Sequence, residues 1–355
     1  MTTSVEKQYG LEDKNCFDFL RVIFCTIIIF SHLYELSQCK DLNFLSFFHD
    51  IGIMALQAFF IISGFLVAKS YQRTSTLKKY FIKRAKRLFP AYIFLLLLTV
   101  IIMSLFSKYS FFDYFKNTDI YKYFAWNIMF LNFMHPCLPG VFENNLLCSV
   151  NGSLWTLKVE ESFYIALPLI FYFIRKTKRT IIVFAAIYFS SLLYWYIMAD
   201  ILNKPLLAKQ MPGYLAFFIT GIFFYLNLNY VLTNKKKLFE LVIISLVTTC
   251  FFSFQINILY PAAFGLLIVI IAYSLPVFNN FGKYGDFTYG LYIYHFPIIQ
   301  VFRQYDLFEK YNAVAMAIVV VAITFLFAAF SWFFIERRFL DRFKKRNMKL
   351  IMTEC

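Results

Sequence analysis

The stretch that decides the fold is Phe17 to Leu36, which reads FDFLRVIFCTIIIFSHLYEL. Its length and its almost wholly apolar composition predict a helix that crosses a membrane. Two ionisable residues, Arg21 and His32, lie within it. The two residues are eleven positions apart, and at about 100° per residue this rotation is about 20° more than three full turns. Both side chains therefore lie on one stripe of the helix, about 16 Å apart along its axis.

Ionisable side chains are costly inside a bilayer, so their position limits what this helix can do. If Arg21 and His32 face a bundle interior or a water-filled cavity, their shared stripe indicates a polar track through the membrane. Alternatively, Arg21 extends to the lipid headgroups and His32 is a packed, hydrogen-bonded histidine. The other segments of the chain are needed to decide between these interpretations.

The composition of the 355 residues excludes a soluble protein of one or two domains. Hydrophobic residues make up 61% and charged residues only 15%, which is typical of a multispanning membrane protein. The net charge of +15 could suggest nucleic acid, but the basic residues lie in short loops between apolar runs, where membrane topology explains them better. We therefore expect the lipid bilayer as a partner, no nucleic acid, and no cleaved signal peptide.

Ten apolar runs are long enough to cross about 30 Å of hydrocarbon. They predict an all-α, polytopic transmembrane helical bundle. Residues Tyr121 to Met134 form a shorter run with several polar interruptions, which we assign to an interfacial or re-entrant helix in the long outer loop. The predicted spans are 17–35, 51–69, 88–107, 160–174, 180–199, 212–229, 238–255, 259–275, 287–303 and 313–335.

The distribution of Lys and Arg predicts the orientation. With the N terminus inside, the inner segments hold 25 of these residues and the outer segments nine. Cytoplasmic loops carry such an excess, so we predict a cell-membrane protein with both termini in the cytoplasm. The predicted divisions are an N-terminal tail (1–16), a membrane domain (17–335) and a basic C-terminal tail (336–355).

The seven cysteines show neither a CxxC pair nor a His/Cys cluster with metal-ligand spacing, so we predict no metal site. Cys137 and Cys148 share the predicted outer loop, and Cys39 lies on the same side. This placement allows a disulfide in an oxidising compartment without establishing one.

Arg84 and Arg87 lie in the first inner loop, AKSYQRTSTLKKYFIKRAKRLFPAY, which contains eight basic residues and no acid. Three residues apart on a helix, their guanidinium groups would point the same way. Such forked donors suit phosphate oxygens, which favours a phosphate-binding role. The alternative is contact with anionic lipid headgroups, a common role of basic segments beside a membrane.

Glu160 and Glu161 open the fourth predicted span, within NGSLWTLKVEESFYIALPL. Acidic residues in a first turn also favour the helix dipole, which is the structural alternative. Glu160 is expected in the same outer half of the membrane as His32, where a carboxylate could orient or deprotonate an imidazole. Trp155 and Tyr164, nearby aromatic residues at the interface, are predicted to line a cavity.

The ninth predicted span, FGKYGDFTYGLYIYHFPIIQ, contains His295 two residues before Pro297. A histidine beside a proline kink either lines the cavity or packs against a carbonyl that the proline frees. In the closing segment, FIERRF, Glu336 is expected to pair locally with the arginines that follow it.

In their order and spacing, these segments resemble the acyltransferase-3 family of integral-membrane O-acyltransferases, over essentially the whole chain. Arg21 and His32 resemble the family's Arg-x10-His signature, and Arg84 with Arg87 resembles its Arg-x-x-Arg pair. The segment SLWTLKVEESFY resembles the more specific Ser-Leu-Trp-Ser-Leu-x-x-Glu-x-x-Phe-Tyr motif, with Thr in the place of the second Ser and Glu160 at the acidic position. TYGLYIYHFPI and FIERRF resemble its two closing segments.

The resemblance implies transfer of an acyl group, usually acetyl, from cytoplasmic acyl-CoA to a hydroxyl of a surface carbohydrate such as lipopolysaccharide, capsule or another envelope glycan. The arginines at 21, 84 and 87 would then serve donor binding. His32 would act as general base or transient acyl carrier, and Glu160 would fix its tautomer and stabilise the imidazolium. No permanently bound cofactor is implied, and the oligomeric state stays open.

A polysaccharide exporter or flippase with the same helices is the alternative function, since a fold alone does not prove chemistry. A pure conduit has no need for His32, Glu160 and the arginine pair together. Their joint presence favours the enzyme.

Overall fold

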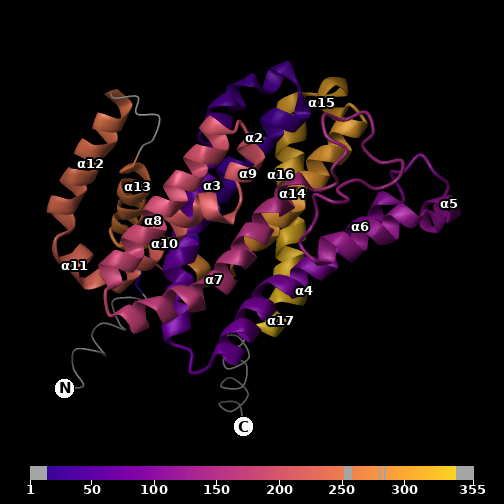
Figure 1. Cartoon of the computed structure of the whole chain (residues 1–355). Coiled ribbons are helices and arrows are strands. Elements are labelled where there is room, and N and C mark those ends of the chain that lie inside the picture. Colours follow the sequence, from indigo (N-terminus) through magenta and orange to yellow (C-terminus); the bar gives the residue numbers. More distant parts are fainter. Residues whose placement is uncertain (1–13, 252–257, 280, 284, 341–355) are drawn as a thin grey trace, which may run out of the picture. The chain divides into compact units, whose positions relative to one another are not determined.

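Helices account for all the regular structure that the computed structural model describes, which covers residues 14–251, 258–279, 281–283 and 285–340 (Figure 1). No strand occurs in this part of the chain, so the all-α prediction is confirmed. The predicted tails at 1–16 and 336–355 lie mostly outside the described residues.

Each of the ten predicted spans overlaps a helix, and residues 252–255 of the seventh predicted span lie outside the described residues. This agreement follows from apolar runs that end at charged or turn-forming residues. The helices are α2 (Phe17–Ser37), α3 (Ser46–Gln72), α4 (Leu77–Met103), α7 (Trp155–Thr177), α8 (Thr180–Tyr196), α10 (Met211–Leu226), α12 (Lys235–Phe251), α13 (Tyr260–Ala272), α14 (Thr288–Gln304) and α16 (Ala313–Ser331).

Fewer than ten of these helices are long and apolar enough to cross a membrane by length and composition. Within the described residues six qualify, or seven if the bent pair Tyr260–Ala272 and Pro276–Lys283 forms one span. Four helices fall short for physical reasons. Helix α7 carries five charged residues, which are Lys158, Glu160, Glu161, Arg175 and Lys176, while α12, α13 and α14 have only 17, 13 and 17 residues. The chain is a multi-pass membrane protein, but the number ten exceeds what length and composition support.

The loop between α4 and α7, which the sequence predicts on the outer side and which is called the outer loop below, contains two short helices, α5 (Phe111–Lys116) and α6 (Thr118–Ile128). Side chains of Ser110 and Asn117 cap their N termini by accepting backbone N–H groups. With 11 residues α6 is about 16 Å long, too short to span a bilayer. The predicted non-spanning helix at 121–134 therefore exists, although it begins and ends earlier. After it, Cys137 and Cys148 form a disulfide.

The chain divides into two compact units. The first comprises residues 1–24, 54–80 and 159–284. In it, α3 and α10 approach closely because Gly64 and Gly221 have no side chains. A Cβ at Gly64 would lie 2.1 Å from the Phe218 carbonyl oxygen, and one at Gly221 would lie 2.0 Å from that of Ile61. Small residues of this kind let membrane helices pack backbone to backbone.

The second unit comprises residues 25–53, 81–158 and 285–355, and α14 holds much of it together. Helices α14 and α16 pack side by side at Gly290, where a Cβ would meet the Ala328 Cα at 2.7 Å (Figure 1). Towards its end α14 fixes the outer loop through two amides. Gln300 Nε2 donates to the carbonyls of Leu147 and Ser149, and Gln304 Nε2 donates to that of Phe106.

Candidate functional site

Pro297 opens a gap in the hydrogen-bond ladder of α14, and the outer loop fills it. Proline has no N–H, so the carbonyl of Ile293, four residues earlier, loses its helical donor. The side-chain amide of Asn151 donates to this carbonyl instead, over 2.7 Å. Asn151 directly precedes η2 (Gly152–Leu154), so the beginning of the SLWTL segment is fixed against the middle of α14.

Further contacts between the same two segments surround residues 292–296. The Phe296 ring lies so close to Gly152 that a Cβ there would be 2.7 Å from its Cζ atom. The hydroxyls of Thr156 and Tyr292 lie 2.7 Å apart, and Tyr292 also donates to the Ser153 carbonyl over 3.3 Å. This part of α14 is therefore held on one side by the motif segment.

His32 and His295 meet within this supported region. Nδ1 of His32 lies 2.7 Å from Nε2 of His295, and the rings stack at 5.0 Å between centroids and 12° between planes. Nδ1 of His295 lies 3.2 Å from the Leu291 carbonyl oxygen. The His295 side chain is fully buried, His32 is partly buried, and the Phe296 ring contacts His32 edge to face at 5.3 Å. Of the two histidines, only His32 therefore keeps some exposed surface.

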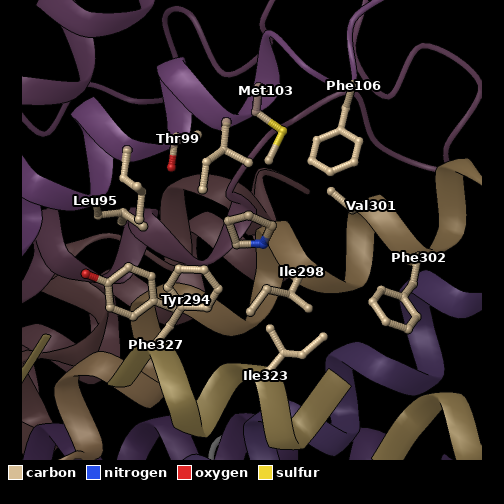
Figure 2. Close-up of a pocket in the computed structure, with 13 residues that line it drawn as sticks. Leu95, Thr99, Met103, Phe106, Tyr294, Ile298, Val301, Phe302, Ile323 and Phe327 are labelled. Atoms are coloured by element: carbon tan, nitrogen blue, oxygen red, sulfur yellow. The ribbon is translucent and has the colours of Figure 1, made fainter. Parts of the chain in front are cut away.

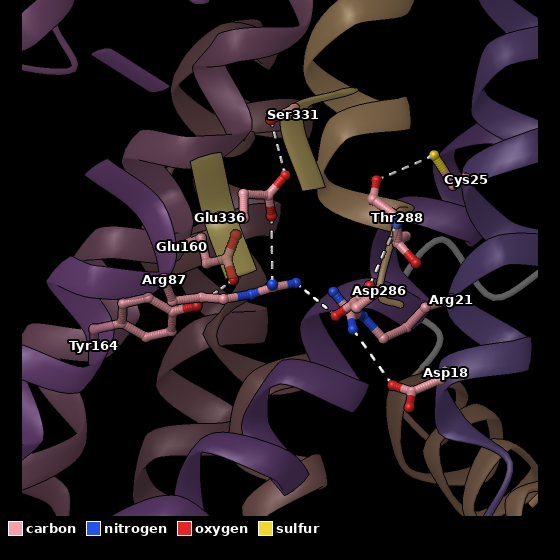
Figure 3. A network of polar contacts seen from close by, with 10 residues as sticks. All are labelled: Asp18, Arg21, Cys25, Arg87, Glu160, Tyr164, Asp286, Thr288, Ser331 and Glu336. Carbon is pink, nitrogen blue, oxygen red and sulfur yellow. Dashed lines mark hydrogen bonds and ion pairs between the residues drawn. The ribbon is translucent and has the colours of Figure 1, made fainter. Parts of the chain in front are cut away.

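Arg87 forms the centre of a second polar cluster. It projects from α4, and its Nη2 atom lies 2.6 Å from a carboxylate oxygen of Asp286, while Nη1 lies 3.6 Å from one of Glu336 (Figure 3). The guanidinium carbon also lies 5.8 Å from the centre of the Tyr289 ring. One positive charge is therefore shared between two carboxylates from distant parts of the chain.

Glu336 ends η6 (Trp332–Glu336), a π-helical turn that continues α16. Its side chain is almost completely buried, and one of its oxygens accepts a hydrogen bond from Ser331 over 3.0 Å (Figure 3). The sequence predicts a local pair with the following arginines. The structure adds Arg87, a partner about 250 positions away in sequence.

Arg84 and Arg21, the other two residues that the sequence suggests for acyl-CoA binding, lie on the expected helices. Arg84 lies one turn before Arg87 on α4 and is partly buried. Arg21 lies on α2, where its Nη1 atom is 3.6 Å from Asp18, three residues earlier. Because α2 is one continuous helix, Arg21 and His32 share its stripe as predicted.

Glu160 lies on α7 in the first unit, and Tyr164, one turn later, donates a hydrogen bond to it from its hydroxyl (Figure 3). The backbone carbonyl of Tyr164 accepts from the Tyr80 hydroxyl over 2.9 Å, which fixes this turn. Trp155 is the first residue of α7 and is partly buried. Of the ring nitrogens of His32, Nδ1 lies against His295, and the action of Glu160 on His32 stays a prediction.

A separate cavity of about 260 Å³ lies between α4, α14 and α16 (Figure 2). Its lining is almost wholly apolar and carries no charged side chain, so it offers no group for acyl transfer. It includes Leu95, Thr99, Tyr294, Ile298, Ile323 and Phe327. Within the described part of the chain, no three His, Cys, Asp or Glu side chains are grouped as metal ligands.

Sequence reasoning missed two participants, Asp286 and Asn151. A sequence feature pointed to Asp286: it is an acidic residue two positions before an apolar helix, in a segment predicted to lie on the inner side, where basic residues predominate. For Asn151 the available sequence feature was Pro297, because a proline inside a helix leaves a carbonyl that needs a donor from elsewhere. Nothing in the pattern indicated that His295 would bind His32 directly.

Comparison with known proteins places these residues in a family context. Residues 14–336 match the acyltransferase 3 family, described as an acyltransferase domain. An O-acetyl transferase of Shigella phage Sf6 is 27% identical over 94% of this chain and 98% of its own length. Nodulation protein 10 of Rhizobium leguminosarum is 27% identical over 81% of this chain and 83% of its own.

A peptidoglycan O-acetyltransferase of Listeria monocytogenes is 24% identical over 80% of this chain and 51% of its own length. No solved structure matches the chain. The similarity therefore covers nearly all of the helices that carry the histidine pair and the Arg87 cluster.

Proposed function

Because this chain belongs to the acyltransferase 3 family and is a membrane O-acetyltransferase, we propose that it moves an acetyl group from cytoplasmic acetyl-CoA to a hydroxyl of an extracytoplasmic glycan. The observation that carries this proposal is the similarity to the phage Sf6 O-acetyl transferase over almost both whole lengths. It also favours an enzyme over a polysaccharide exporter. Lipopolysaccharide, capsule and peptidoglycan-like polymers are the acceptor classes that we propose.

His32 is proposed as the general base. Its ring takes the proton of the acceptor hydroxyl, and the oxygen attacks the carbonyl carbon of the acetyl thioester. The C–S bond then breaks, and the coenzyme thiolate leaves with the proton that His32 held. The products are the acetyl ester and the free CoA thiol, and His32 returns to its neutral form. Glu160 would stabilise the transient imidazolium by its negative charge.

Arg84 and Arg87 are proposed to bind the phosphates of the coenzyme at the cytoplasmic end of α4, and Arg21 to balance negative charge along α2. Arg84 and Arg87 lie one turn apart on α4, so their guanidinium groups point the same way, and each forked group can bond phosphate oxygens in parallel. The ion pair of Arg87 with Asp286 fixes the direction of its side chain. This arrangement supports a fixed phosphate site at the end of a rigid helix.

We further propose ten spans with both termini in the cytoplasm. The support is that each predicted span overlaps a helix within the described residues, and that Lys and Arg are concentrated in alternate loops. This orientation brings the donor to the side of Arg84 and Arg87, and the acceptor to the side of the outer loop.

Acetyl transfer in isolated membranes tests the function. Membranes that hold the full chain receive labelled acetyl-CoA and native envelope glycan, and three variants are compared with the wild type. We expect His32→Ala to abolish labelling of the glycan at unchanged protein level. Arg84→Ala should raise the donor concentration needed by roughly tenfold or more, as loss of a charged hydrogen bond implies. The control His135→Ala, in the outer loop, should label like the wild type. Equal labelling by all four proteins would contradict the assigned roles.

A further inference from the structure

We propose that His295 is a positioning residue that fixes the tautomer of His32, so that Nε2 of His32 is the nitrogen that accepts the acceptor's proton. This inference rests on the proposed role of His32 as base. It assigns to His295 the orienting function that the sequence suggested for Glu160.

The direction of the hydrogen bonds follows from a carbonyl group. The Leu291 carbonyl oxygen can only accept, so Nδ1 of His295, 3.2 Å away, must carry the hydrogen. A neutral imidazole has one N–H and one lone pair. Nε2 of His295 therefore holds the lone pair and acts as an acceptor.

The assigned acceptor on His295 in turn determines which nitrogen of His32 carries the hydrogen. Nε2 of His295 lies 2.7 Å from Nδ1 of His32, within hydrogen-bond distance. Because this Nε2 is an acceptor, Nδ1 of His32 must be the donor. In a neutral His32 ring the lone pair is then on Nε2, which is the form a general base requires.

The surroundings of His295 hold this arrangement rigidly. The Asn151 amide fixes the carbonyl that Pro297 leaves open, and Gly152 allows the Phe296 ring to lie against the loop. The His295 side chain has no exposed surface, and its ring is nearly parallel to that of His32. A rotation of His295 would break both of its hydrogen bonds, so a second tautomer of His32 is disfavoured.

A second imidazole suits this position better than a carboxylate does. A carboxylate buried among apolar helices would carry a charge that is costly without a partner. Two neutral imidazoles carry no charge at rest. When Nε2 of His32 takes the proton, the bond from its Nδ1–H to His295 becomes charge-assisted and therefore stronger. The pair thus favours the protonated intermediate more than the resting state, which is what catalysis needs.

Two substitutions separate this role from a merely structural one. In His295→Gln the side-chain oxygen can still accept a hydrogen bond near the original Nε2 position, whereas His295→Leu removes the acceptor and keeps an apolar side chain. We expect kcat for acetyl transfer to fall roughly 100-fold in His295→Leu, at the lower end of what general-base catalysis contributes, with an unchanged KM for acetyl-CoA. His295→Gln should keep most of the wild-type kcat, and His135→Gln should match the wild type.

Nitrogen NMR of ¹⁵N-histidine-labelled protein reads the tautomer without turnover. With four histidines in the chain, the substitutions assign each signal. We expect His32 to show a protonated Nδ1 and a bare Nε2 in the wild type, in His295→Gln and in Glu160→Gln, and a redistributed proton in His295→Leu.

Three results would overturn the inference: a protonated Nε2 on neutral His32 in the wild type, a wild-type kcat in His295→Leu, or an equal loss in the Leu and Gln variants. Full activity of His32→Ala would instead reject the proposed function. The NMR signals distinguish that failure, because they report the hydrogen bond whether or not His32 acts as base.

Discussion

Arg87 combines a structural and a proposed binding role in one side chain, and the two can be separated. Glu336 is 2% exposed, so removing Arg87 takes a cationic partner away from a buried carboxylate. We expect Arg87→Met to destabilise the protein by about 3 kcal/mol or more. The double variant Arg87→Met with Glu336→Gln should regain part of that stability, because the more deeply buried of the two carboxylates is then neutral.

Thermal unfolding in detergent measures the first effect, and KM for acetyl-CoA measures the second. If Arg87 binds donor phosphate, the double variant recovers stability while KM stays raised. Recovery of both quantities would show that Arg87 serves only the ion-pair cluster. The single variant Glu336→Gln is the matched control, since it leaves the arginine in place.

The proposed role of Glu160 can be tested by comparing a substitution of Glu160 with one of Tyr164, which donates a hydrogen bond to it. If its charge stabilises the imidazolium, Glu160→Gln lowers kcat by roughly tenfold or more and leaves KM for acetyl-CoA unchanged, because the charge acts only after the proton has moved. Tyr164→Phe removes the hydrogen bond to Glu160 but keeps the carboxylate, so it should reduce kcat much less. Initial rates at saturating donor give the comparison, and a larger loss in Tyr164→Phe than in Glu160→Gln would contradict the assignment.

At the level of elements, the contact between Asn151 of the outer loop and α14 holds the part of α14 that carries His295. Asn151→Ala would leave the Ile293 carbonyl without its donor, and an unsatisfied buried carbonyl costs about 1–3 kcal/mol. Adding Pro297→Ala restores a backbone N–H at position 297, which can bond to the same carbonyl. We therefore expect the double variant to unfold at a higher temperature than Asn151→Ala alone. An additive loss would show that the Asn151 contact does not serve the proline gap.

The helices themselves could be predicted from the sequence, whereas their contacts could not. Apolar runs between charged or turn-forming residues identify α2, α10 and α16, because one-dimensional periodicity is sufficient for a helix. The contact of His32 with His295 joins positions 263 apart, and no local pattern encodes which faces of two helices meet. The positions of Cys137 and Cys148 in one loop allowed a disulfide but could not predict it. Whether two cysteines pair depends on the path of the loop between them, which the sequence pattern does not give.

For the whole molecule, the main question is which face of the membrane each loop occupies, because the proposed reaction takes its donor from one side and its acceptor from the other. Two independent features favour the same orientation. The segments assigned to the inside hold most of the Lys and Arg residues, and the disulfide lies in a loop assigned to the oxidising outside.

Thiol labelling in intact cells tests this orientation directly. Lys78→Cys and Lys116→Cys each introduce a cysteine at an exposed position, one in the basic loop and one at the end of α5. Of the five cysteines outside the disulfide, Cys16, Cys25 and Cys39 are buried and should contribute little. The other two, Cys250 and Cys355, are replaced by Ser in the background protein, because the structure does not describe their side chains. A membrane-impermeant reagent should label Lys116→Cys in intact cells and Lys78→Cys only after the membrane is opened. The opposite pattern would reverse the membrane sides of Arg84 and the outer loop, and acetyl-CoA could then not reach the proposed phosphate site from the cytoplasm.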